Sequence, residues 1–144
     1  MGPLVLDTNV LAYAVGDDHP FRGPCRELVD AIGDGRPSAT TTVEVLQEFA
    51  YVHGRRRTRS DATSRALRYA ALLAPLFPLT AEHLAAGVLL WQRHDALSSL
   101  DAILAASCIN TGATLVSADK AFTRVRDLDH VVPDARGVKR LIAG

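Results

Sequence analysis

Four carboxylates that are far apart in the sequence each lie beside an apolar segment that a globular fold would bury: Asp7, Glu48, Asp101 and Asp119. Acids that a fold brings within a few ångströms of one another repel unless a hard divalent cation compensates their charge, and oxygen ligands favour magnesium (Mg²⁺) or manganese (Mn²⁺). Such an ion lowers the pKa of a bound water and neutralises charge on phosphate oxygens. These residues therefore indicate hydrolysis of phosphodiester bonds.

The elements that would position these acids alternate between short apolar runs and longer helical stretches. The apolar runs predict strands at residues 3–7, 37–42, 76–79, 113–117 and 129–133. Helical periodicity covers residues 8–15, 20–34, 43–56, 59–74, 80–94, 99–111, 119–126 and 134–143. Apolar strands separated by helices are typical of a parallel sheet covered on both faces. We therefore predict an α/β fold, a three-layer α/β/α domain with about five parallel strands, spanning residues 1–144 as one domain.

Helix capping is the alternative role for Asp7 and Asp119, and a favourable interaction with the helix dipole is the alternative for Asp101. Asp7 and Asp119 each precede a predicted helix, where Asp is a favoured N-cap, and each also follows a predicted strand. Asp101 lies in the first turn of the helix at 99–111, at the border of its apolar face, with Ser98 or Ser99 available as the cap. Ligand sites in parallel sheets lie beyond the carboxyl ends of the strands. Acids at that edge are therefore more easily explained by one shared acidic pocket than by unrelated capping roles.

Two glutamates compete for the second acidic position. On a helix that begins at Val43, Glu48 lies about 40° from the edge of the apolar face and Glu44 about 80° from it. Glu48 is therefore the first choice for an inward-facing acid. Glu44 stays open as the alternative, because it follows Ser38 by six residues, which also suits a strand end followed by a helix.

Composition excludes several classes of protein. Among 144 residues, 48% are hydrophobic and 22% charged, with 16 basic and 16 acidic side chains, so neither a disordered chain nor a globally basic nucleic-acid binder is indicated. The chain shows no leader pattern and no apolar run of about 18 residues, so we expect a cytoplasmic protein that does not enter a membrane. Cys25 and Cys108 lack metal-ligand spacing and are expected in the core, and the five histidines show no paired spacing either.

The segments around the acids resemble the successive acidic motifs of PIN-domain nucleases: LDTNVLAYA, VLQEFAYV, SSLDAILAAS and TLVSADKAF. Their order and spacing match across nearly the whole chain. Within that superfamily the chain looks most like VapC, the ribonuclease toxin of type II VapBC toxin–antitoxin pairs. The resemblance implies a metal-dependent endoribonuclease that cuts RNA and leaves a 3′-hydroxyl and a 5′-phosphate.

The same resemblance implies roles and partners. Asp7 and Asp101 match the principal metal ligands, Glu48 completes the acidic cluster, and Asp119 acts directly or through water; the matching supporting polar residues are Asn9 and Ser117. A VapB-type antitoxin and a homodimer are the expected protein partners. The remaining alternatives are a PIN nuclease that processes RNA without being a toxin, and a catalytically silent domain that binds RNA or protein.

Basic and aromatic side chains suggest where RNA and a partner could bind. Four guanidinium groups crowd one short stretch, where they could contact RNA phosphates or belong to a solvated turn: Arg55, Arg56, Arg57 and Arg59. Tyr51, Tyr69 and Trp91 could stack on unpaired bases, although aromatics at helical spacing more often belong to the core. The helical pair at 43–74 carries more apolar residues than a surface hairpin needs, so part of it is expected to face a partner.

Overall fold

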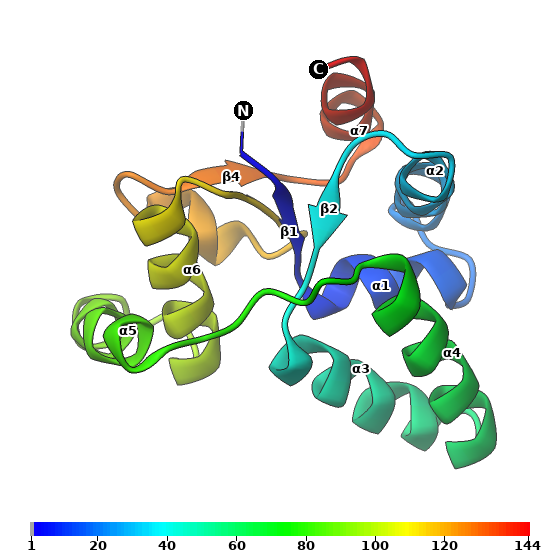
Figure 1. The fold of residues 1–144 in the computed structure, drawn as a ribbon, viewed down its shortest axis with the longest axis horizontal. Coiled ribbons are helices and arrows are strands. Elements are labelled where there is room, and N and C mark those ends of the chain that lie inside the picture. Colours follow the sequence, from blue (N-terminus) through cyan, green and yellow to red (C-terminus); the bar gives the residue numbers. More distant parts are fainter. Residues whose placement is uncertain (1) are drawn as a thin grey trace.

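A parallel sheet with the strand order β2-β1-β3-β4 forms the centre of the computed structural model, which describes residues 2–144 (Figure 1). The strands are β1 (Leu4–Leu6), β2 (Ala39–Thr40), β3 (Thr114–Val116) and β4 (Asp129–Val131). Leu4 pairs with Ala39 on one side and with Thr114 on the other. Every residue of β1 and β3 is buried, because these two strands lie in the middle of a sheet that is covered on both faces.

Helices cover both faces of this sheet. They are α1 (Thr8–Val15), α2 (Arg22–Gly33), α3 (Val43–Arg56), α4 (Arg59–Leu72), α5 (Ala81–Arg93), α6 (Ser99–Thr111) and α7 (Ala135–Ala143). In Figure 1, α1, α2 and α7 lie on one side of the strands and α5 and α6 on the other, while α3 and α4 form a helical pair at the carboxyl end of β2. The predicted three-layer α/β/α class with a parallel sheet is confirmed.

The sheet has four strands in residues 2–144 rather than about five, because the segment predicted as a strand at 76–79 is extended chain outside the sheet. It forms one backbone bond to the chain beyond β2, from the Phe77 N–H to the Thr41 carbonyl oxygen at 2.8 Å. Pro75 and Pro78 have no N–H group to donate, so the ladder does not continue. The helix predicted at 119–126 is also shorter than expected, a 3₁₀ turn, η1, at Lys120–Arg124.

Helix α6 is buried on most of its circumference, whereas the sequence suggested one apolar face. Its buried residues are Ala102, Leu104, Ala105, Ala106, Ser107 and Cys108. These mostly small side chains let the helix lie between the sheet and α5. A Cβ atom on Gly87 of α5 would lie 2.5 Å from the Cα of Ile103, so only glycine permits this close approach of the two helices.

The rest of the core agrees in part with the residues that the sequence predicted to be buried. Cys25 and Cys108 are buried free thiols, as expected. Tyr69 is also buried, but Tyr51 and Trp91 are exposed. Phe49 is fully buried between α3 and α4, with its ring 5.1 Å from that of Tyr69, so it is not available to a partner. In residues 2–144, every helix is too short or too polar to cross a membrane.

Candidate active site

The four acids predicted from the sequence line one cavity of about 390 Å³ at the carboxyl edge of the sheet: Asp7, Glu48, Asp101 and Asp119. Each comes from a different part of the chain. Parallel strands end at the same edge, and the loops that follow them converge there. The fold therefore gathers acids that are separated by up to 112 positions, the difference between 119 and 7.

Asp7 and Asp119 cap helices and line the cavity at once. Asp7 follows β1 with extended dihedral angles, and its Oδ1 accepts a 2.8 Å hydrogen bond from the Thr8 N–H. Oδ1 of Asp119 accepts a 2.9 Å bond from the Ala121 N–H at the start of η1. Capping uses one oxygen of each carboxylate, so capping and membership of the acidic cavity do not exclude one another.

Asp101 lies in the same cavity but comes from the start of a helix and not from the end of a strand. Helix α6 ends at Gly112, whose φ of 72° reverses the chain into β3. Because α6 runs antiparallel to β3, its first turn lies at the carboxyl edge of the sheet. The Ser98 hydroxyl accepts a 3.1 Å bond from the Asp101 N–H, so Ser98, and not Ser99, is the cap of this helix.

The structure distinguishes between the two glutamates of α3. Glu48 lines the acidic cavity, and its Oε2 accepts a 2.7 Å hydrogen bond from the hydroxyl of Thr8. Glu44 is exposed in the first turn of the helix and does not line this cavity. Both glutamates are exposed, but of the two only Glu48 borders the acidic cavity.

Ser117 and Asn9 hold the acids in place. The buried hydroxyl of Ser117 donates a 2.7 Å hydrogen bond to Oδ2 of Asp7 and accepts one from the Asp119 N–H at 3.1 Å. The Asn9 amide nitrogen lies 3.0 Å from Ser117 Oγ and 3.3 Å from Asp7 Oδ2, and its Oδ1 accepts a bond from the Ala118 N–H. Both predicted supporting residues therefore connect the ends of β1 and β3.

Burial and the charges of neighbouring acids raise the pKa of Asp7 and of Asp101. Burial, opposed by the Ser117 hydrogen bond, raises the pKa of Asp7 above its ordinary value, and the charges of Glu48 and Asp119 add to this. Burial also raises the pKa of Asp101 to about 6, with contributions from the charges of Asp7, Asp119 and Glu48. Within residues 2–144, none of the four forms an ion pair with a basic side chain.

This donor set fits a hard divalent cation, because it consists of carboxylate oxygens whose repulsion a cation would relieve. In the described part of the chain, no three His, Cys, Asp or Glu side chains are gathered closely enough to form a ready-made metal centre. The carboxylates instead surround the cavity. The pKa of Asp7 and the pKa of Asp101 are raised, so a cation beside these two carboxylates would offset the cost of their ionisation.

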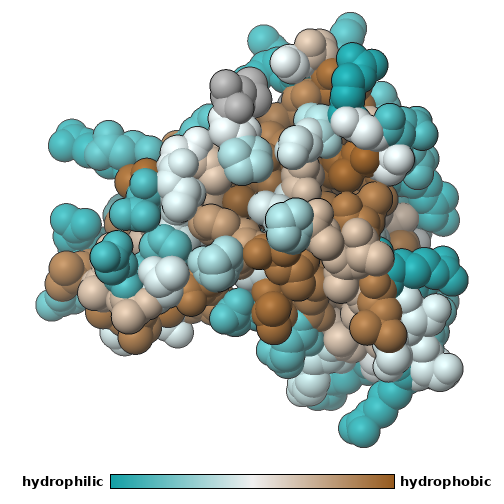
Figure 2. All heavy atoms as spheres, viewed as in Figure 1, coloured by the Kyte–Doolittle hydropathy of each residue, from teal (hydrophilic) through white to brown (hydrophobic). Residues whose placement is uncertain are grey.

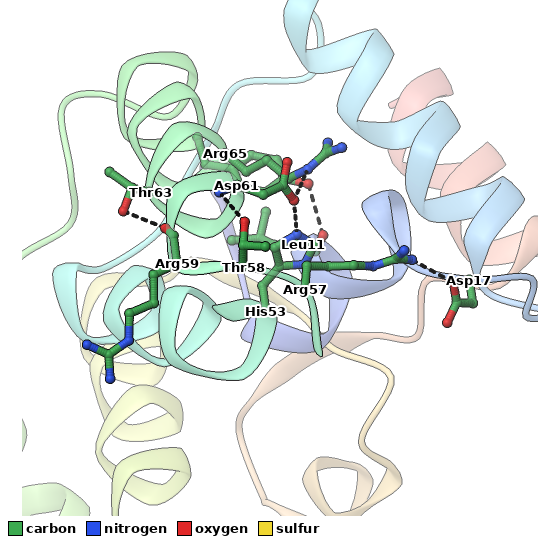
Figure 3. Close-up of polar contacts among 10 residues, drawn as sticks. Leu11, Asp17, His53, Arg57, Thr58, Arg59, Asp61, Thr63 and Arg65 are labelled. Atoms are coloured by element: carbon green, nitrogen blue, oxygen red, sulfur yellow. Dashed lines mark hydrogen bonds and ion pairs between the residues drawn. The ribbon is translucent and has the colours of Figure 1, made fainter. Parts of the chain in front are cut away.

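The four arginines after Gly54 do not form one patch. Arg56 lines the acidic cavity, and Arg57 forms a 2.6 Å ion pair with Asp17. Arg55 donates to the hydroxyl of Tyr51 at 2.9 Å on the exposed side of α3. In Figure 3 the guanidinium groups of Arg57 and Arg59 point in opposite directions, and only that of Arg57 turns toward Asp17.

A second cavity of about 680 Å³ adjoins the first and shares Gly16, Asp17 and Asp18 with it. Several basic side chains line this second cavity: Arg22, Arg26, Arg57 and Arg65. Figure 3 shows how His53 of α3 and Arg65 of α4 both approach the carboxylate of Asp61, at 2.6 and 3.2 Å. The acidic and basic cavities therefore meet at the loop that follows α1.

Sequence reasoning missed two aromatic residues of the acidic cavity, Tyr13 and His19. Tyr13 follows Asn9 by four residues, and this spacing places both side chains on the same face of α1. This spacing could have predicted from the sequence that Tyr13 lies near Asn9. His19 lies in the loop between α1 and α2, and nothing in the sequence pattern places its ring against the acids.

Three comparisons relate this chain to known proteins. The family model described as PIN domain matches residues 4–128. Ribonuclease VapC7 of Mycobacterium tuberculosis is 46% identical, with 96% of this chain and 97% of the relative covered. Ribonuclease VapC23 of the same species is 32% identical, with 92% and 97% covered. The crystal structure of VapBC2 from Rickettsia felis, bound to a promoter DNA fragment, matches with a TM-score of 0.68 at 20% identity, covering 88% of this chain and 96% of that chain; at this identity the match shows the fold alone.

Proposed function

Because the chain belongs to the PIN-domain family and, within it, to the VapC group, we propose that it is an endoribonuclease that hydrolyses RNA phosphodiester bonds as a toxin. Its partner in this role is a VapB-type antitoxin that neutralises it. The main observation that supports this activity is that four carboxylates line one cavity. The pKa of Asp7 and the pKa of Asp101 are both raised in this cavity. The near full-length likeness to a ribonuclease supports RNA as the substrate.

The acids are proposed to hold Mg²⁺, with Mn²⁺ as a substitute. Asp7 and Asp101 are the principal ligands, and Asp119 contributes directly or through a water molecule. When bound, the ion would lower the pKa of a water molecule and neutralise charge on the phosphate. Ser117 and Asn9 fix the Oδ2 atom of Asp7, so the principal ligand is oriented before any ion binds.

Glu48 is proposed to accept the proton of the attacking water. Its Oε2 is held by the hydroxyl of Thr8, which leaves Oε1 to accept a hydrogen bond from water in the cavity. Attack on phosphorus breaks the bond to the 3′-oxygen, so the products are a 3′-hydroxyl and a 5′-phosphate. Glu44 has no part in this role, because it lies outside the cavity.

Arginines near the acidic cavity are proposed to bind RNA phosphates. Arg56 lines that cavity, and Arg57 lines the adjoining one with Arg22, Arg26 and Arg65. Guanidinium groups at this border offset the repulsion between the acids and a polyanion. Arg55 and Arg59 line neither of these two cavities, so their contribution to RNA binding is expected to be smaller.

A homodimer is proposed through α5. Leu84, Val88 and Trp91 are 52%, 41% and 49% exposed, and their spacing places them in one stripe on the helix. In Figure 2, brown apolar atoms lie over α5 at the lower left of the view. An exposed apolar stripe of this kind is unusual on a monomer, and a two-fold axis would let the same stripe of a second copy cover it.

Mapping RNA ends tests the proposed activity. The chain is induced in bacterial cells, and new 5′-phosphate ends in total RNA are sequenced for the wild type and for an Asp7→Asn variant. Asparagine is a good N-cap, so this variant keeps the start of α1 while it removes one carboxylate charge. We expect new ends with the wild type alone, and co-expression of a cognate antitoxin should suppress them. Identical RNA ends in wild-type and variant cells would contradict the proposed nuclease.

A further inference from the structure

One wall of the acidic cavity is a stack of aromatic rings. The rings of Tyr13 and His19 lie 4.3 Å apart between centroids with their planes at 20°, and both residues line the cavity that holds the four acids. The ring of Phe21 lies near both, 5.4 Å from that of Tyr13 and 5.7 Å from that of His19. Tyr13 is half-buried and packs against the core, whereas His19 is exposed, so His19 is the ring of this pair that is more open to a ligand.

The orientation of the His19 ring is fixed by its own loop. Nδ1 of His19 accepts a 3.1 Å hydrogen bond from the Phe21 N–H, and the His19 carbonyl oxygen accepts one from the Arg22 N–H at 3.0 Å. Two residues earlier, Asp17 pairs with Arg57 of the turn between α3 and α4. A ring that is held in place before a ligand arrives loses little freedom on binding.

The chemistry of this wall indicates its ligand. Aromatic rings stack on flat groups, and the bases of RNA are flat and carry no charge that the acids would repel. The cavity volume of about 390 Å³ falls in the range of small-ligand sites. Because the same cavity holds the acids proposed to cut the chain, a base on this wall would belong to a nucleotide that flanks the cut bond.

We propose that Tyr13 and His19 form a stacking platform for an unpaired RNA base adjacent to the bond that is cut. This inference rests on the proposed function and assigns two positioning residues to its RNA substrate. A base within a duplex has both faces covered by its neighbours, so it must leave the stack before it can lie on the platform. Tyr13 and His19 are positioning residues in this scheme, since they orient the substrate and do not touch the phosphorus.

Cleavage kinetics with matched RNA substrates test the platform. A short single-stranded RNA that the wild type cuts is compared with versions that lack the base on either side of the cut. With the intact RNA, we expect KM to rise by about 5- to 150-fold in His19→Leu, the range measured for base–aromatic stacking, with little change in kcat. His19→Phe keeps an aromatic face and should stay near the wild type. Without the platform-bound base, the wild type and His19→Leu should become equal.

Two further measurements separate the possible failures. His94→Leu makes the same change at a histidine that does not line the acidic cavity and serves as the matched control, and thermal unfolding checks that each variant folds. Binding of an RNA that carries 2-aminopurine is measured by fluorescence quenching in excess chelator, so stacking is observed without cleavage. If the wild type cuts no RNA, it can still quench the probe more strongly than His19→Leu does. That result would contradict the proposed hydrolysis and support the platform.

The opposite result would overturn the platform alone. If the wild type cuts RNA while His19→Leu matches it in KM and quenching, stacking on His19 plays no part. If His19→Phe loses as much affinity as His19→Leu, His19 acts through its ring nitrogens and not through its aromatic face. In either case the proposed nuclease activity would stand.

Discussion

The hydroxyl of Thr8 donates a 2.7 Å hydrogen bond to Oε2 of Glu48, and this bond joins the first turn of α1 to the second turn of α3. Thr8 directly follows Asp7, so the bond brings a helix side chain to the end of the central strand. The contact also gives Glu48 a fixed orientation that exposed glutamates usually lack. Glu44, one turn earlier on the same helix, does not line the cavity.

Separate Glu48→Gln and Glu44→Gln variants should therefore differ strongly in activity. Glutamine keeps the size of the side chain and still accepts a bond from Thr8, but it cannot take a proton from water. We expect RNA cleavage by Glu48→Gln to fall by about 100-fold or more, as for loss of a general base, while Glu44→Gln stays close to the wild type. Initial rates on one RNA substrate measure the difference. An inactive Glu44→Gln beside an active Glu48→Gln would overturn the assignment.

Much of this site could be predicted because parallel strands share an edge. Asp7 and Asp119 follow apolar runs, so the topology alone brings them together. The angle on α3 favoured Glu48 by a small margin, and only the contact with Thr8, 40 residues away, distinguishes it from Glu44. His19 was beyond sequence reasoning, since its position depends on a loop that Arg57 contacts through Asp17.

The errors in the predicted fold have local causes. The run at 76–79 has the composition of a strand, but Pro75 and Pro78 remove the donors that a ladder requires. The four arginines were predicted as possible contacts for RNA phosphates because they are neighbours in sequence, and their arrangement in space could not be predicted. Two of these arginines lie in the last turn of α3 and one begins α4, so their side chains diverge.

Mg²⁺ should stabilise the folded protein as well as activate it. A ligand that binds only the folded state adds about 2.7 kcal/mol to the free energy of unfolding at 100 times its dissociation constant. We expect the Tm of the wild type to rise with Mg²⁺ and to fall back in EDTA, with cleavage lost in EDTA. Asp101→Asn should lose most of the rise, because it removes one of the two carboxylates proposed as principal ligands. Cleavage that continues in excess EDTA would contradict the metal dependence.

Asp101 should make the metal-free protein less stable as the pH rises. Its pKa is about 6 in the folded state against 3.8 as the ordinary value, so the folded state holds the proton more tightly. The contribution of Asp101 to the free energy of unfolding is then greatest below about pH 4. It declines between pH 4 and 6 and is constant above that window. In EDTA at pH 7.5, Asp101→Asn should exceed the wild type by on the order of 1 kcal/mol, a value reduced for the partial exposure of this carboxylate.

Urea unfolding at several pH values measures this effect. The informative quantity is the difference in unfolding free energy between the wild type and Asp101→Asn, because acids outside the cavity titrate equally in both. Asp95→Asn changes an exposed aspartate outside the cavity and serves as the control. A difference between the wild type and Asp101→Asn that does not change from pH 4 to pH 7.5 would contradict the raised pKa.

Loss of the Ser117 hydroxyl should cost both stability and ion affinity. This fully buried group bonds Asp7, Asn9 and the backbone of Asp119. Ser117→Ala leaves buried polar groups without a partner, which costs about 1–3 kcal/mol of unfolding free energy. The Kd for Mg²⁺ should also rise, since Asp7 loses its orienting donor. Ser99→Ala, at an exposed serine of α6, is the control, and equal stability of the two variants would show that the network is not required.

The apolar stripe on α5 should determine whether the protein is a dimer. Close packing through Gly87 places one face of α5 against α6, and Leu84, Val88 and Trp91 form a stripe beside that face. A charge placed in a two-fold interface meets itself across the axis, so Val88→Asp should convert a dimer to a monomer in sedimentation velocity.

Leu89→Asp provides the matched control on the same helix. Leu89 is 60% exposed, more than Val88, but helical geometry turns it about 100° away from that neighbour. The control should remain dimeric if the stripe is the interface, because the new charge then faces solvent. A dimer that survives Val88→Asp, or one that both variants abolish equally, would show that α5 does not form the interface through this stripe.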